Sequence, residues 1–162
     1  MRSFSVFVLF FCAINLADAE LLITEPSQAC VLLNEVSLTT NGWKNEYDQE
    51  FGCSSNYKQL GSGFPLANNL AFYVEGNNNS VVQAYLMLNI NDKTSASSAH
   101  QELLKAAKIL SNKQTGKQLS QKLIDSITKG SNTSQKLGNA TVDIVREDWP
   151  TGRGYEVKVT IK

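Results

Sequence analysis

The chain has 162 residues, of which 42% are apolar and 19% are charged, and its 15 basic side chains are balanced by 15 acidic ones. This composition is too apolar and too weakly charged for a disordered chain, and the length favours one domain. A net charge of zero argues against a dedicated nucleic-acid-binding protein, and a single His excludes any site built from several histidines.

Residues 1–19 are predicted to be a cleavable secretory signal peptide. Arg2 gives a positive start, a nearly unbroken apolar run spans Phe4–Leu16, and Ala17-Asp18-Ala19 has the small-x-small pattern that predicts cleavage after Ala19. The apolar run is too short to cross a bilayer, which needs roughly 20 residues. An uncleaved N-terminal anchor is the alternative. We therefore expect a secreted or periplasmic chain, residues 20–162, that forms a single domain with no transmembrane segment after signal cleavage.

Two cysteines remain after the signal peptide is removed, Cys30 and Cys53. An even number of cysteines in an oxidising compartment predicts a disulfide between them. The competing interpretation is a reactive redox pair, but the spacing is not Cys-x-x-Cys and no cationic residue stands close to either cysteine. The structural bridge is preferred.

The first predicted element after the signal peptide is a helix over residues 24–36. Thr24 can cap it, Pro26 suits its first turn, and apolar residues recur at helical spacing on one face. Three aromatic residues, Trp43, Tyr47 and Phe51, then recur every four positions. They predict a short second helix or a loop packed by aromatic side chains.

Residues 52–69 are predicted to form a long irregular loop, because Gly and Pro interrupt any regular pattern there. Loops of this kind carry binding or catalytic groups more often than regular elements do, so Ser54, Ser55, Tyr57 and Lys58 are candidates for such a role. The alternative is a covering loop fastened by the disulfide.

Two β-hairpins are predicted, one on each side of a helical pair. Residues 70–75 and 81–90 alternate between apolar and polar and form the first hairpin, and residues 140–145 and 155–161 form the second. Between them, Ser98 and Thr115 each begin a helix with a capping box, residues 112–114 link the two helices, and Gly130 ends the second one.

These elements predict an α+β fold. Its four-stranded antiparallel sheet consists of the two hairpins, and the N-terminal helix and the helical hairpin pack on one face of that sheet. Residues 131–139 are expected to be a polar linker.

The connection of residues 146–154 is the first candidate binding site. Trp149, Arg146 and Arg153 belong to residue types that are enriched at binding hot spots. If Trp149 stands at the tip of the hairpin, it can anchor a partner. Alternatively, Trp149 folds back to cap the core and the arginines pair with neighbouring acids.

Charge is distributed unevenly and gives a second candidate. Residues 20–97 hold eight acidic and three basic side chains, whereas residues 98–162 hold six acidic and eleven basic ones. Lys117 and Lys122 belong to the basic helical region and are candidates for contacts with an acidic partner. A solvated helix face is the alternative explanation.

No phosphate-binding, nucleophile-elbow or metal-binding motif stands in the sequence, so neither a cofactor nor a metal is expected. The preferred interpretation is a non-enzymatic binding module for a protein or an anionic envelope or extracellular polymer, not for nucleic acid. The alternative is a small hydrolase or an enzyme inhibitor that uses the tethered loop, with Ser54, Ser55 or Tyr57 reaching His100. Without such a contact, His100 is expected at the surface of its helix.

Overall fold

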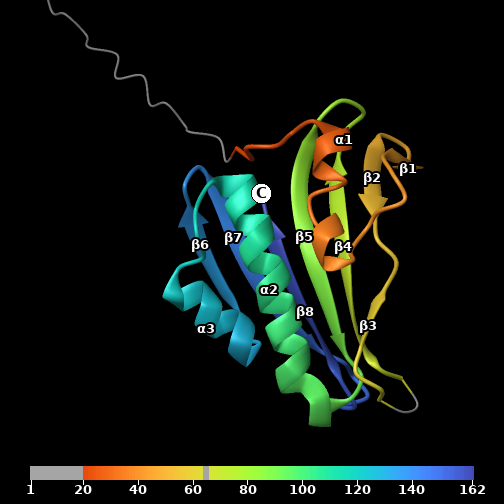
Figure 1. Ribbon diagram of the computed structural model, residues 1–162, viewed down its shortest axis with the longest axis vertical. Coiled ribbons are helices and arrows are strands. Elements are labelled where there is room, and N and C mark those ends of the chain that lie inside the picture. Colours follow the sequence, from red (N-terminus) through yellow and green to blue (C-terminus); the bar gives the residue numbers. More distant parts are fainter. Residues whose placement is uncertain (1–19, 64–65) are drawn as a thin grey trace, which may run out of the picture.

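The computed structural model describes residues 20–63 and 66–162, so the expected signal peptide lies outside the described residues. One antiparallel sheet runs through the described chain in the order β1-β2-β4-β5-β8-β7-β6, and β3 pairs with β4 (Figure 1). The strands are β1 (Lys44–Tyr47), β2 (Glu50–Ser54), β3 (Lys58–Leu60), β4 (Asn68–Gly76), β5 (Val81–Ile90), β6 (Thr133–Leu137), β7 (Ala140–Asp148) and β8 (Tyr155–Ile161).

The α+β class is confirmed, but the expected four-stranded sheet is wrong, because the sheet has eight strands. The two predicted hairpins are present as β4–β5 and β7–β8, and they meet through the pairing of β5 with β8. The other four strands arise in the segments expected to be an aromatic helix or loop, an irregular loop and a polar linker. These strands are short and contain few buried residues, so the apolar alternation that reveals a half-buried strand is missing from them.

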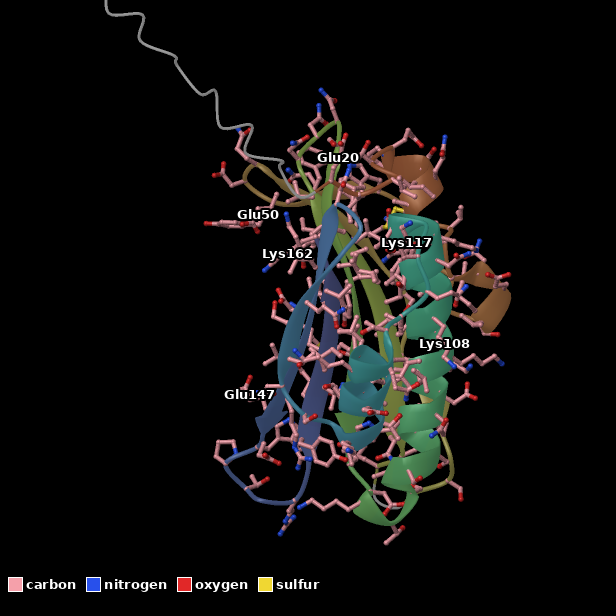
Figure 2. The ribbon with its side chains drawn as sticks, turned by 90° about the vertical axis from the view of Figure 1, so that its left-hand side faces the viewer. Glu20, Glu50, Lys108, Lys117, Glu147 and Lys162 are labelled. Atoms are coloured by element: carbon pink, nitrogen blue, oxygen red, sulfur yellow. A yellow bond between two sulfur atoms is a disulfide. The ribbon has the colours of Figure 1, made fainter. Side chains whose placement is uncertain are left out.

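All the helices lie on one side of the sheet, and no second layer of described residues covers the other side (Figures 1 and 2). The long helix α2 crosses the middle of the sheet, with α3 beside it and the short helix α1 over β4 and β5. The helical elements are α1 (Pro26–Ala29), η1 (Asn34–Val36), η2 (Lys93–Ser95), α2 (Ala96–Thr115) and α3 (Gln121–Lys129).

Several helix boundaries differ from the predicted ones. The expected helix over residues 24–36 is two short pieces, α1 and η1, separated by turns. Helix α2 runs through the expected linker and ends at Gly116, whose φ of 65° suits a C-terminal cap. Helix α3 is capped by Ser120, whose hydroxyl accepts from the N–H of Leu123, and it ends at Gly130 as predicted.

The core lies between the sheet and the helices. Alternate residues of the four central strands point toward α2, among them Leu70, Phe72, Leu86 and Val157, and they are fully buried. Strand side chains alternate between faces, so the residues in between lie on the uncovered side. None of the helices in residues 20–63 and 66–162 is both long enough and apolar enough to cross a membrane.

The predicted disulfide between Cys30 and Cys53 is present and fastens the end of α1 to β2. It indicates an oxidising, extracytoplasmic compartment, because cytosolic thiols are kept reduced. The chain before α1 is also held in place: Leu21 is buried, and the Ile23 backbone both donates to and accepts from the buried side chain of Gln114.

Candidate functional site

The uncovered side of the sheet, termed the open face, is the main candidate surface. Figure 2 shows Glu50, Glu147 and Lys162 on this side and Lys108 and Lys117 on the helical side. The open face is built by the residues that alternate with the core residues in β4, β5, β7 and β8. They are Asn69, Ala71, Tyr73, Glu75, Gln83, Tyr85, Met87, Asn89, Thr141, Asp143, Val145, Glu147, Glu156, Lys158 and Thr160.

Two stacked tyrosines occupy the centre of the open face. Tyr73 of β4 stands directly opposite Tyr85 of β5, and their rings lie 4.8 Å apart and nearly parallel, at 10°. The Nζ atom of Lys158, from β8, lies 3.7 Å from the centroid of the Tyr85 ring. Because β5 runs between β4 and β8, Tyr73 and Lys158 take opposite faces of Tyr85.

Hydrogen bonds fix the polar groups around this stack. The carboxylate of Glu75 accepts from Nε2 of Gln83 and from the hydroxyl of Tyr85, each at 2.6 Å. The Tyr73 hydroxyl donates to that of Tyr57 at 3.4 Å. Burial, followed by these hydrogen bonds, raises the pKa values of Tyr73 and Tyr85, so both are neutral hydrogen-bonding phenols at physiological pH.

Further acidic side chains lie on the open face along β7 and β8. Glu147 stands directly opposite Glu156 in the β7–β8 pair. Burial, followed by the charge of Glu147, raises the pKa of Glu156. Asp143 is balanced by Lys162, with an O–N distance of 2.8 Å. In the part of the chain that the structure describes, no three His, Cys, Asp or Glu side chains gather closely enough to hold a metal ion.

Two adjoining hollows lie where β1, β2, β4 and β5 meet. The larger, of about 390 Å³, includes Glu46, Glu50, Glu75, Phe51 and Val82 in its walls. The smaller, of about 240 Å³, shares Glu46 and Glu75 and is completed by Gly52, Cys53, Ser54, Tyr73, Val74 and Tyr85.

The predicted Trp149 connection is largely satisfied by its own contacts. Trp149 is half-buried and lies so close to the backbone of Gly154 that a Cβ atom there would be 2.5 Å from the indole. Arg146 pairs with Asp148 at 2.6 Å and lies 3.7 Å above the Tyr155 ring. Arg153 remains exposed. The Arg146–Asp148 pair agrees with the alternative in which the arginines pair with neighbouring acids, whereas Trp149 packs on Gly154 within the connection. A binding role for Trp149, Arg146 and Arg153 stays a prediction.

Lys117 and Lys122 are both exposed on the helical side. Lys117 follows the C-terminal cap of α2, and Lys122 lies in the first turn of α3. Neither takes part in an ion pair between described residues, whereas Lys113 of the same region pairs with Glu35 at 2.8 Å. An acidic partner for these lysines stays a prediction.

The expectation that His100 lies at the surface of its helix is wrong. His100 is only 4% exposed and lies beneath α3 and β8. Its Nδ1 lies 2.6 Å from the carbonyl oxygen of Ile127 and its Nε2 lies 3.0 Å from the Tyr155 hydroxyl. A carbonyl only accepts, so Nδ1 carries the proton and Nε2 accepts from Tyr155. Both ring nitrogens therefore have partners other than the tethered loop.

The loop candidates have structural roles of their own. Ser54 belongs to β2, and the Ser55 hydroxyl accepts from the N–H of Phe72 and donates to the Asn56 carbonyl. The Lys58 side chain reaches Glu102 at 3.0 Å and the Val36 carbonyl at 3.2 Å. The structure thus brings no loop serine to His100 among the described contacts, whereas Ser54 and Tyr57 both reach the open face beside Tyr73.

The residues that form the open face were not singled out from the sequence. Tyr73 and Tyr85 stand at polar positions of two predicted strands, and a tyrosine at such a position is a usable signal. That they face each other depends on the register of the β4–β5 hairpin, which the sequence did not reveal.

Comparison with known proteins gives one match. A family described as "Family of unknown function (DUF6030)" matches residues 20–154, which is most of the chain. No curated protein and no solved structure matches it.

Proposed function

Because the chain belongs to the DUF6030 family of unknown function, we propose its role from the geometry of the open face. The protein is an exported binding module that docks a protein partner on this face. The observation that carries the proposal is that no layer formed by residues 20–63 and 66–162 covers one whole side of the eight-stranded sheet, which has the Tyr73–Tyr85 stack at its centre.

Export is supported by two independent features. Residues 1–19 have the pattern of a signal peptide with cleavage after Ala19, and the disulfide between Cys30 and Cys53 needs an oxidising compartment. The partner is therefore a protein of the periplasm or of the extracellular space.

The side chains of the open face favour a protein over an anionic polymer. Tyrosine and methionine are enriched at protein interfaces, and Tyr73, Tyr85 and Met87 lie together on β4 and β5. Carboxylates outnumber ammonium groups on this face, so a polyanion would be repelled from it. The carboxylates are Glu46, Glu50, Glu75, Asp143, Glu147 and Glu156, and the ammonium groups are Lys44, Lys136, Lys158 and Lys162.

The proposal is tested by asking which side of the protein retains a partner. Oxidised protein, residues 20–162, is immobilised and used to capture proteins from an envelope extract and from culture medium. One variant combines Tyr73→Ala with Met87→Lys on the open face. The matched control combines Lys117→Glu with Lys122→Glu on the helical side, and melting temperatures verify that both variants fold.

We expect a partner that wild-type protein and the helical-side variant retain and that the open-face variant loses, with affinity reduced about tenfold or more. A purified partner must reproduce that order in a binding titration. If the open-face variant retains the partner as wild type does, or if only the helical-side variant loses it, the proposed docking face is wrong.

A further inference from the structure

The smaller hollow adjoins the tyrosine stack, in which no described side chain stacks on the second ring face of Tyr73. Tyr85 is enclosed on both faces, by the Tyr73 ring at 4.8 Å and by Lys158 at 3.7 Å. The second face of Tyr73 is directed toward β2, where its neighbour across the strand pair is Ser54, followed by Gly52. Both are small residues, and together with Tyr73 they line the smaller hollow, which also touches Tyr85.

Gly52 is essential to the shape of this hollow. It stands opposite Glu75 and contributes no side chain. A Cβ atom at this position would lie 2.8 Å from the carbonyl oxygen of Val74, 3.7 Å from Cγ of Glu46 and 3.9 Å from Cγ of Glu75. The stems of the two glutamates thus flank Gly52, and their carboxylates border the space beside Tyr73.

The charge around the hollow is negative, and hydrogen bonds hold one of its carboxylates in position. Gln83 and Tyr85 hold the Glu75 carboxylate in place. The lining of the hollow includes Glu46 and Glu75 and, within the described residues, no basic side chain. Lys44 pairs with Gly52 in the β1–β2 register, and its Nζ atom lies 3.4 Å from a carboxylate oxygen of Glu46, so it offsets only part of this charge.

We propose that this hollow binds the guanidinium group of an arginine side chain that belongs to the docked protein. A planar cation can stack on the free face of Tyr73, as Lys158 does on Tyr85, while its N–H groups donate to Glu46 and Glu75. Arginine fits better than lysine, because only its flat fork can stack and donate sideways at once. The inference rests on the proposed function and adds the chemistry of the partner segment.

The larger hollow extends the same site. It shares Glu46 and Glu75 with the smaller one and adds the apolar surface of Phe51 and Val82 together with the carboxylate of Glu50. A residue next to the arginine in the partner segment can place an apolar or basic side chain there. The segment recognised is therefore short, basic and exposed on the partner.

The test uses defined peptides and the NMR spectrum of the oxidised protein. The probe is acetyl-Gly-Gly-Arg-Gly-amide, and its matched control replaces arginine by citrulline, which has the same shape but no charge. We expect the arginine peptide to shift the amide signals of Gly52, Tyr73 and Glu75 saturably and the citrulline peptide to leave them in place. Equal shifts from both peptides, or none from either, would overturn the inference.

Two variants change the charge of the site in opposite directions. Glu75→Gln should weaken binding of the arginine peptide about two- to fivefold, because it removes one half-exposed partner of the cation. Lys44→Met should strengthen binding by a similar factor, because it removes a competing ammonium group, and a folding defect cannot imitate a gain. Glu147→Gln, at the far end of the open face, is the control and should change nothing.

The outcomes separate this inference from the proposed function. If the open-face variant loses its captured partner but the arginine peptide does not bind, the docking face stands and the arginine site is wrong. If Lys44→Met weakens binding of the arginine peptide or leaves its affinity unchanged, the site does not select for positive charge and the inference fails. If the peptide binds at Gly52 while capture is insensitive to the open face, the docking proposal fails.

Discussion

His100 is expected to make the stability of the protein depend on pH just below neutrality. It is the single histidine of the chain, and it is buried with Nδ1 bonded to Ile127 and Nε2 bonded to Tyr155. Burial lowers its pKa below the usual 6.5; the bond to the Ile127 carbonyl opposes this, and the nearby charge of Arg146 adds to the lowering. Protonation would place a positive charge beside Arg146 and would remove the acceptor that Tyr155 uses.

The sign and size of the effect follow from proton linkage. The unfolded chain binds a proton at His100 near pH 6.5, before the folded protein does. The stabilisation is therefore complete above that pH and is lost as pH falls toward the folded pKa, by at most about 1.4 kcal/mol for each pH unit. The lowered pKa values of Asp143 and Asp148 act only in more acidic solution, below about pH 4. The raised pKa of Glu156 acts in the opposite direction.

Urea unfolding of residues 20–162 at about pH 7.5, 6.5 and 5.5 measures this slope. The comparison variant is His100→Gln, whose amide can donate and accept but does not titrate in this range. Between about pH 6.5 and 5.5 we expect the free energy of unfolding of wild type to fall by up to about 1.4 kcal/mol and that of the variant to fall much less. A variant with the same slope as wild type would refute the reasoning, as would a His100 ring that titrates by NMR at or above pH 6.5.

Two further changes test the disulfide and the paired acids. Replacing both Cys30 and Cys53 by Ser opens a link across 23 sequence positions and should lower the free energy of unfolding by about 3 kcal/mol. Urea unfolding of the double variant checks this, and an unchanged midpoint would contradict it. Glu147→Gln removes like-charge repulsion across β7–β8 and should raise stability near pH 7 by about 0.2–0.5 kcal/mol, discounted for solvent screening. The same variant should lower the pKa of Glu156 in an NMR titration, and a gain that persists in high salt would argue against a charge effect.

The sequence predicted the elements whose burial imposes a pattern. In β4, β5, β7 and β8 one face of each strand is in the core, so apolar and polar residues alternate and the strands are visible. Strand β1 has no buried residue and β6 has none either, so nothing in their composition distinguishes them from turns. Their strand structure comes from pairing with β2 and β7, which is a tertiary interaction.

The candidate site escaped sequence analysis for a related reason. Its parts come from β1, β2, β4, β5 and β8, and only the strand register places Gly52 opposite Glu75, Ser54 opposite Tyr73 and Tyr73 opposite Tyr85. A shift of a single residue in any pair would send these side chains to the other face. The disulfide was easier to predict, because the two cysteines that follow the predicted signal peptide allow only one pairing.

The two tyrosines of the stack differ in what folding alone explains. Tyr85 is only 6% exposed, its hydroxyl is bonded to Glu75, and both of its ring faces are covered, so packing and hydrogen bonding account for it. Tyr73 is half-buried and has one ring face directed at a hollow. A cross-strand aromatic pair contributes about 0.2–1 kcal/mol, and a phenylalanine at position 73 would supply most of it. Packing does explain the missing side chain at Gly52, because a Cβ atom there would lie 2.8 Å from the Val74 carbonyl oxygen. The second ring face of Tyr73 is what packing leaves unexplained, and it is the surface that the proposed arginine would cover.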